Sequence, residues 1–285
     1  MDLYLSAAEY RAAPTAVDSN NLVAGGNQAV QDAALLEQIR RASSWINNEL
    51  NQSVIAASRV ELHRARYQRD GTLSIRTNGT PANQLLGLSL GTHAGDLAVV
   101  SDLSGAFIDE GQWVIPNTGV NAGGYPIQFG PRVTAGGRLL AKLTVVSGWP
   151  NTTLTASAIA GATTITVASG AGFTPALGSD VASDSVQIID GALTETVTVS
   201  SVAGNVLTVS ALVNAHSSGA VVSSMPGAIK EAATLVTSAF IRTRGSEAII
   251  MAQGTTPGPS AGDMANRGPS LGAAARMLVT YRRVR

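Results

Sequence analysis

The 285-residue chain contains no cysteine, and this absence excludes several kinds of chemistry. Disulfide bonds, thiolate nucleophiles and cysteine-ligated metal sites all require that residue. Stability must therefore come from the packing of apolar side chains or from assembly with other chains. A hydrophobic content of 45% is enough to build a core of that kind.

Charged and aromatic residues are also scarce. Charged residues make up 13% of the chain and balance at 19 basic against 19 acidic side chains, so no general attraction for nucleic-acid phosphates exists. Aromatic residues make up only 4%, too few for a surface on which bases stack. We therefore expect any contact with DNA to be local or non-adhesive.

Long apolar runs are missing as well. None approaches the roughly 20 residues that a membrane-spanning helix needs. The start, Met1-Asp2-Leu3-Tyr4, has neither the basic nor the apolar region of a signal peptide. These features predict synthesis in the cytosol and no membrane partner.

Motifs for catalysis, metal binding and nucleotide binding are weak or missing. "GLSLG" at 87–91 matches the nucleophile elbow G-x-S-x-G, but a turn and a strand follow it instead of the required helix. His63, His93 and His216 are far apart and lack the spacing of zinc ligands. We expect no enzymatic activity, no cofactor and no metal. A hydrolase built on Ser89 is the least favoured interpretation.

Helical patterns occupy both ends of the chain. Ser6 and Glu9 form an S-x-x-E capping box that predicts a short helix, which Pro14 ends near Ala13. Two longer amphipathic helices are predicted at about 29–51 and 226–244, the second beginning at Pro226 and ending at Gly245. Their apolar stripes match, so we expect them to pack together through Leu35, Ile39, Ala42, Ile46, Leu50, Ile229, Ala233, Val236 and Phe240.

Strand patterns fill the centre. The segments 59–67 and 71–79 alternate apolar and polar residues around Asp70-Gly71, which is a strong hairpin signal. Further short strands are expected up to about residue 150. Five more, separated by turn signals within about 65 residues, predict a small all-β sandwich or barrel.

The chain is therefore predicted to be an α+β protein in which a β-domain is inserted into a helical core. Residues 1–57 and 226–253 form the core, 58–150 a β-rich region, 151–225 the inserted β-domain, and 254–269 a flexible loop by composition. Residues 270–285 are expected to form an extended arm ending in "YRRVR". This basic cluster is either a solvated end or a segment that binds a partner.

Five stretches together resemble the head-tail connector, or adaptor, proteins of long-tailed bacteriophages. They are "YLSAAEYRAAPTAVD", "IRRASSWINNELNQ", "SGWPNTTLTAS", "PGAIKEAATLVTSAFIRTRG" and the terminal "YRRVR". The resemblance extends over nearly the whole chain. In the branch that the chain resembles most, a Thr- and Val-rich β-domain is inserted before the second long helix.

This resemblance implies a structural protein of the virion neck, assembled in the host cytoplasm. It implies a ring, expected to hold twelve copies, that docks on the portal protein and on a stopper or tail-completion protein. Viral DNA would pass through the ring without specific binding. The portal contact would involve Leu278, Tyr281, Arg282, Arg283 and Arg285. The main alternative is a virion decoration or tail protein whose β-domain binds carbohydrate or a neighbouring protein.

Overall fold

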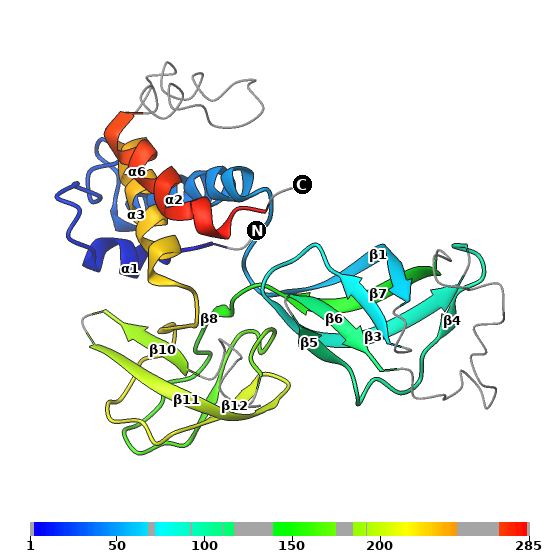
Figure 1. The fold of residues 1–285 in the computed structure, drawn as a ribbon. Helices are drawn as coiled ribbons and strands as arrows, with labels where there is room; N and C mark the ends of the chain where they lie inside the picture. Colours follow the sequence, from blue (N-terminus) through cyan, green and yellow to red (C-terminus); the bar gives the residue numbers. More distant parts are fainter. Residues whose placement is uncertain are drawn as a thin grey trace.

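The structure is a computed structural model that describes residues 3–67, 72–91, 93–109, 111–116, 139–174, 185–191, 193–243 and 268–283. Its helices and strands form three lobes, each with its own cluster of buried apolar side chains (Figure 1). One lobe is helical and two are built from strands. The protein thus belongs to the mixed α+β class, as its sequence predicts.

The helical lobe begins with the predicted capping box. Ser6 Oγ accepts a hydrogen bond from the Glu9 amide at 3.1 Å, and a Glu9 carboxylate oxygen accepts from the Ser6 amide at 2.8 Å. Helix α1 (Ala7–Ala12) follows. Two backbone amides at the helix start thus gain partners inside the chain, which is the physical basis of the motif.

Helices α2 (Gln28–Leu50) and α3 (Gly227–Arg242) correspond to the two predicted amphipathic helices. The side chain of Asn27 caps the start of α2, and Asn51, at a φ of 56°, ends it in the left-handed conformation. Pro226 lies just before α3, and Thr243 follows its last residue. Gly245 and Arg244, which were expected near this helix end, lie outside the described residues.

Helices α2 and α3 contact each other over a shared apolar core. Phe240 is half-buried against this core. The other residues of the two predicted stripes are fully buried in it: Leu35, Ile39, Ala42, Ile46, Leu50, Ile229, Ala233 and Val236.

The C-terminal segment corrects the expectation of an extended arm. Residues 268–281 form helix α6 (Gly268–Leu278) and a 3₁₀ turn, η1 (Val279–Tyr281), and α6 packs on α3 (Figure 1). Leu271, Ala274, Ala275 and Leu278 are buried in the helical core. An apolar stripe of this kind is more stable against the chain's own core than in water.

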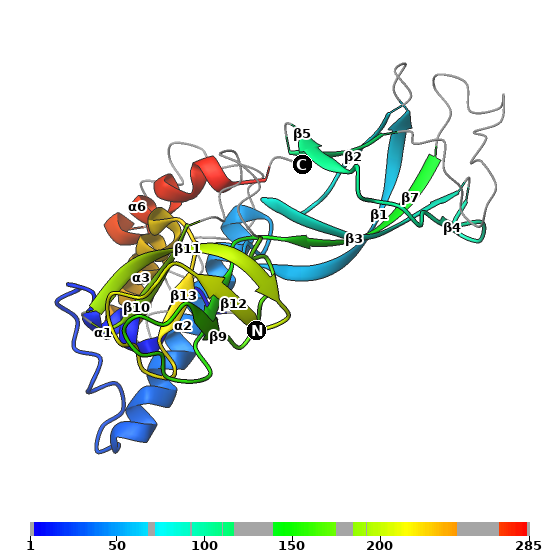
Figure 2. The same cartoon turned by 90° about the horizontal axis from the view of Figure 1, so that it is seen from below.

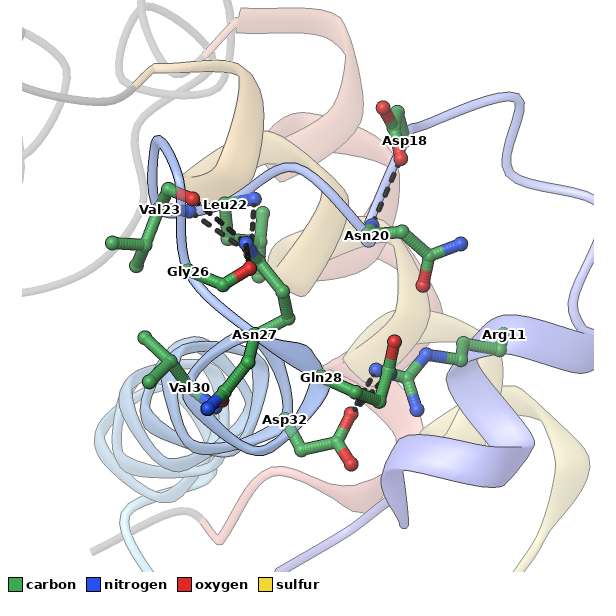
Figure 3. A network of polar contacts seen from close by, with 11 residues as sticks. Arg11, Asp18, Asn20, Leu22, Val23, Gly26, Asn27, Gln28, Val30 and Asp32 are labelled. Atoms are coloured by element: carbon green, nitrogen blue, oxygen red, sulfur yellow. Dashed lines mark hydrogen bonds and ion pairs between the residues drawn. The ribbon is translucent and has the colours of Figure 1, made fainter.

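A polar network fixes the segment between α1 and α2 (Figure 3). Gln31 is buried, and its side chain accepts hydrogen bonds from the amides of Leu22 and Val23 at 2.7 and 3.0 Å. Beside it, Arg11 of α1 pairs with Asp32 of α2. These contacts hold the non-helical chain against the first turn of α2.

The first β-lobe is a seven-stranded antiparallel sheet in the order β4-β3-β7-β1-β2-β6-β5. Strands β1 and β2 pair at Tyr67↔Leu73, as the predicted hairpin requires, and Asp70-Gly71 lies outside the described residues. The bounds are β1 (Ala57–Tyr67), β2 (Leu73–Arg76), β3 (Ala82–Gly91), β4 (Ala98–Val99), β5 (Phe107–Asp109), β6 (Gln112–Ile115) and β7 (Leu139–Ser147).

The second β-lobe is a closed barrel with the strand order β8-β13-β10-β11-β12-β9. Its first and last strands meet just beyond their ends, where the Thr155 amide donates to Thr166 O at 2.9 Å and the Ala168 amide to Thr153 O at 2.8 Å. The bounds are β8 (Asn151–Thr153), β9 (Thr164–Thr166), β10 (Ser185–Asp190), β11 (Leu193–Ala203), β12 (Val206–Val209) and β13 (Val221–Ser223). Of the two predicted alternatives, a sandwich or a barrel, the closed sheet is the barrel. Strand β8 was not predicted from the sequence.

The segment "SGWPN" at 147–151 joins the three lobes, and Figure 2 shows the barrel beside the helices with the sheet extending away from both. Trp149 donates its amide to Val54 O at 2.7 Å, and Gly148 donates to Pro81 O at 2.8 Å. Ser224, at the barrel's exit, donates to Pro150 O at 3.0 Å. The segment is therefore fastened to each lobe by backbone hydrogen bonds.

Candidate functional site

A cleft of about 700 Å³ lies beside this junction, between the sheet lobe and the C-terminal residues. Its lining comes from β1, from the end of β2 and the turn that follows, from the junction, and from the C-terminal end of the described chain. The lining residues are His63, Arg76, Thr77, Asn78, Thr80, Pro81, Trp149, Thr280, Tyr281, Arg282 and Arg283.

The C-terminal wall of the cleft is tied to the end of α2. The Arg283 amide donates to Leu50 O at 3.0 Å, and the Gln52 side chain donates to Tyr281 O at 3.1 Å. The rings of Trp149 and Tyr281 meet edge to face, with their centroids 5.6 Å apart. This wall is thus held in place by α2 and by the junction.

The opposite wall is the turn at 77–81, held against β7 by a close approach of the backbone. A Cβ atom at Gly79 would lie 1.9 Å from Ser147 Oγ, so only glycine fits at this position. The next residue back, Asn78, accepts a hydrogen bond from the Arg283 guanidinium through Oδ1. The two walls are therefore linked by a side-chain contact.

The charge of the lining is positive. The side chain of Arg76 is exposed and has no ion pair or hydrogen bond among the described residues, and Arg282 lies 4.0 Å from Glu49. None of the described residues that line the cleft is acidic. The nearby Glu61 carboxylate is buried and accepts from the Asn78 amide at 2.7 Å while lying 2.6 Å from His63 Nε2. The negative charge of Glu61 therefore interacts with Asn78 and His63 and does not face the cleft.

These groups suit the binding of an anion better than catalysis. Guanidinium groups donate paired hydrogen bonds to carboxylates and phosphates. His63 Nε2 lies 2.6 Å from a Glu61 carboxylate oxygen, and among the described residues it is not paired with a hydroxyl nucleophile. The described lining is thus cationic, with an aromatic side formed by Trp149 and Tyr281.

The residues expected to bind a portal divide into three groups. Tyr281, Arg282 and Arg283 line the cleft. Leu278 is fully buried in the helical core, so in this structure it is a core residue that does not line the cleft. Arg285 lies outside the described residues.

Sequence reasoning missed the other wall of the cleft. Arg76 and Asn78 stand at the end of a short strand, and Trp149 stands in the junction. The only signal was "TNGTP" at 77–81, a turn-forming run with glycine at its centre. Nothing in that run pointed to the distant C-terminal residues.

The weaker candidates for chemistry have structural roles. Ser89 lies inside β3, opposite Val99 and Lys142, so the strand-to-helix turn of a nucleophile elbow is absent there. In the part of the chain that the structure describes, no group of three or more potential ligands is arranged to hold a metal ion. Nor is any helix of that part long and apolar enough to cross a membrane.

A buried histidine in the barrel is a second polar cluster. His216 Nε2 lies 3.5 Å from a Glu195 carboxylate oxygen, and Nδ1 lies 4.0 Å from Asp190. The other Glu195 oxygen accepts from the amides of Val213 and Asn214 at 3.1 and 2.9 Å. The cluster fixes the loop before β13 to the hairpin of β10 and β11.

Comparison with known proteins identifies no family. No protein-family model matches the chain, and no curated protein matches it. Among solved structures, a chain described as "Neck of empty GTA particle computed with C6 symmetry" is similar at 15% identity and a TM-score of 0.36. The match covers 99% of this chain and 94% of the other. A likeness of that strength carries no argument about function.

Proposed function

We propose that this protein is a structural component of a virion neck, an adaptor that forms a ring between the portal and the tail. The observation that carries the proposal is the position of Tyr281, Arg282 and Arg283. The family resemblance assigns this segment to the portal contact, and these residues line a cationic cleft at the junction of the three lobes. A docking role is consistent with such a lining.

Exposed apolar side chains on two lobes also support a role in assembly. Val60 and Leu62 share the outer face of β1 and are 64% and 54% exposed. Ile159 and Val213, on neighbouring loops of the barrel, are 75% and 79% exposed. Contiguous exposed apolar surface marks contact sites for other proteins, and a ring subunit needs two complementary patches.

The alternative role, a decoration or tail protein that binds through its barrel, is favoured by the apolar loop pair Ile159 and Val213 alone. Residues 151–225 contain a single aromatic residue, Phe173, and it is buried. An exposed ring on which a sugar could stack is therefore missing from that lobe. If the alternative holds, the ligand of the barrel is a neighbouring protein and not a carbohydrate.

Electron microscopy of the purified protein, alone and mixed with the portal of the same particle, tests the adaptor proposal. We expect closed rings, or a ring bound to the portal. A protein that stays monomeric with the portal present, and that immunogold labelling places away from the neck, would contradict it. Labelling over the capsid or the tail would support the alternative.

A further inference from the structure

We propose that the cleft between the sheet lobe and the C-terminal residues is a preformed binding site for an acidic, extended segment of a partner protein. The proposal deepens the adaptor function by naming the chemistry of one docking contact. It rests on that function only for the identity of the partner, because the cleft lies within a single chain.

The charge of the cleft favours an anionic occupant. Arg76, Arg282 and Arg283 line the cleft, and no acidic side chain is among the described residues of its lining. The whole chain is neutral, so this local excess is not a consequence of composition. Arg283 is bonded to Asn78 and Arg282 lies 4.0 Å from Glu49, whereas the side chain of Arg76 has no ion pair or hydrogen bond among the described residues. A carboxylate placed between these guanidinium groups lowers their mutual repulsion while accepting paired hydrogen bonds.

The shape of the cleft favours a peptide over a duplex. A volume of about 700 Å³ is in the range of sites that enclose small ligands or a few side chains. Duplex DNA is instead held by cations spread along an exposed surface that follows its phosphates. The aromatic rings of Trp149 and Tyr281 give the cleft an apolar side. The methylene groups of Glu side chains can pack against such a surface.

The cleft is held open by contacts within the chain. Gln52 and Leu50 hold the C-terminal wall, and the approach of Gly79 to Ser147 holds the turn opposite. Arg283 bridges the two walls through Asn78. A partner segment therefore binds without ordering these residues, and this lowers the entropic cost of association.

Fluorescence anisotropy on the full chain tests the proposal. The probe is a labelled Glu-rich peptide of about 12 residues, and its control has Gln at each Glu position. We expect binding of the Glu peptide, weakened by added salt, and no binding of the Gln peptide. Arg76→Ala and Arg282→Ala should each weaken binding about tenfold.

Arg276→Ala is the matched control, because Arg276 is exposed on α6 and does not line the cleft. It removes the same charge and should leave the affinity unchanged. Equal binding of both peptides, or an equal loss in the Arg276 variant, would overturn the proposal. So would binding of a short DNA duplex that depends on Arg76 and Arg282 and excludes the peptide.

Thermal unfolding of each variant shows that any loss of binding does not come from misfolding. Ring formation is measured separately by electron microscopy. If the protein forms rings but does not bind the peptide, only the proposed binding role of the cleft is contradicted. If it binds the peptide but neither forms rings nor binds the portal, only the adaptor function is contradicted.

Discussion

At two glycines the backbone comes so close to a neighbouring segment that no side chain fits. Gly79 approaches Ser147, and Gly148 has a φ of +105° with its missing Cβ position 2.6 Å from Ile55 O. Both positions lie at the junction of the lobes. Gly148 thus meets the backbone of Val54 and Ile55 directly, which accounts for the glycine in "SGWPN". Gly79 instead meets the side chain of Ser147 within the sheet lobe.

Gly148→Ala should destabilise the protein by roughly 2–4 kcal/mol, because it adds a steric clash to an unfavourable φ. The matched control is Gly191→Ala, at a φ of +61° with no atom within 4 Å of the added Cβ. That change should cost only about 1 kcal/mol. Urea unfolding measures both, and equal shifts of the two midpoints would contradict the close approach.

A charge pair between α1 and α2 gives a prediction about pH. A hydrogen bond from Arg11, with a second from Gln28, holds the pKa of Asp32 below its ordinary value. The stabilisation is present above the unfolded-state pKa and is lost as the pH falls through the lowered folded-state pKa. Arg11→Ala should therefore move the pKa of Asp32 upward.

Carboxyl-carbon NMR titration measures this change directly. Arg40→Ala is the control, since Arg40 lowers the pKa of Glu37 and not that of Asp32. This change should raise the pKa of Glu37 and leave the pKa of Asp32 unchanged. An Asp32 titration that is the same with and without Arg11 would show that the pair does not form in solution.

Among the elements, helix α6 shows what a periodic pattern leaves open. Leu271, Ala275 and Leu278 recur at the spacing of one helix face, and α6 buries this face in the chain's own core. The same pattern fits a helix that docks on a partner. Periodicity shows that the helix has an apolar face. It does not show which surface covers that face, which here is α3, an element from an earlier part of the sequence.

Leu278→Ala should lower the free energy of unfolding by roughly 2–5 kcal/mol, since it removes a fully buried side chain. Val279→Ala, one residue later and 56% exposed, should change it by less than about 0.5 kcal/mol. Deleting residues 277–285 should likewise destabilise the helical lobe. If the deletion variant is as stable as the full chain, the C-terminal segment is an extended arm detached from the helical core, as first expected.

Local signals predicted some elements well and others not at all. The bounds of α2 follow from its regular apolar spacing, and those of α1 from one capping box. Strand β8 was missed because its sequence, "NTT", has no apolar residue to alternate with polar ones, and its partner β13 lies about seventy positions later. The cleft was missed because its walls are far apart in the sequence: Asn78 and Arg283 are 205 positions apart, and only the folded backbone brings them together.

At the scale of the whole molecule, three lobes, each with its own apolar cluster, meet at one junction. The barrel's entry and exit lie side by side, because the Ser224 amide donates to Pro150 O. An insertion with adjacent ends can be removed without stretching the chain that receives it. This geometry makes the barrel a separable unit.

Replacing residues 151–223 with a short Gly-Ser link should leave the helical lobe folded. We expect the helical circular dichroism signal to persist and to unfold in one transition, because the buried residues of that lobe lie outside the excised range. The excised barrel, produced alone, should give a dispersed amide spectrum. Loss of helical signal in the shortened protein would show that the lobes depend on one another.

The most direct test is a cryo-electron microscopy map of the particle neck that resolves individual side chains. We expect this chain to form a ring beneath the portal, with an acidic segment of a neighbouring protein lying against Arg76 and Arg282. A map in which the chain lies away from the neck, or in which the cleft of a neck ring faces open solvent, would contradict that expectation.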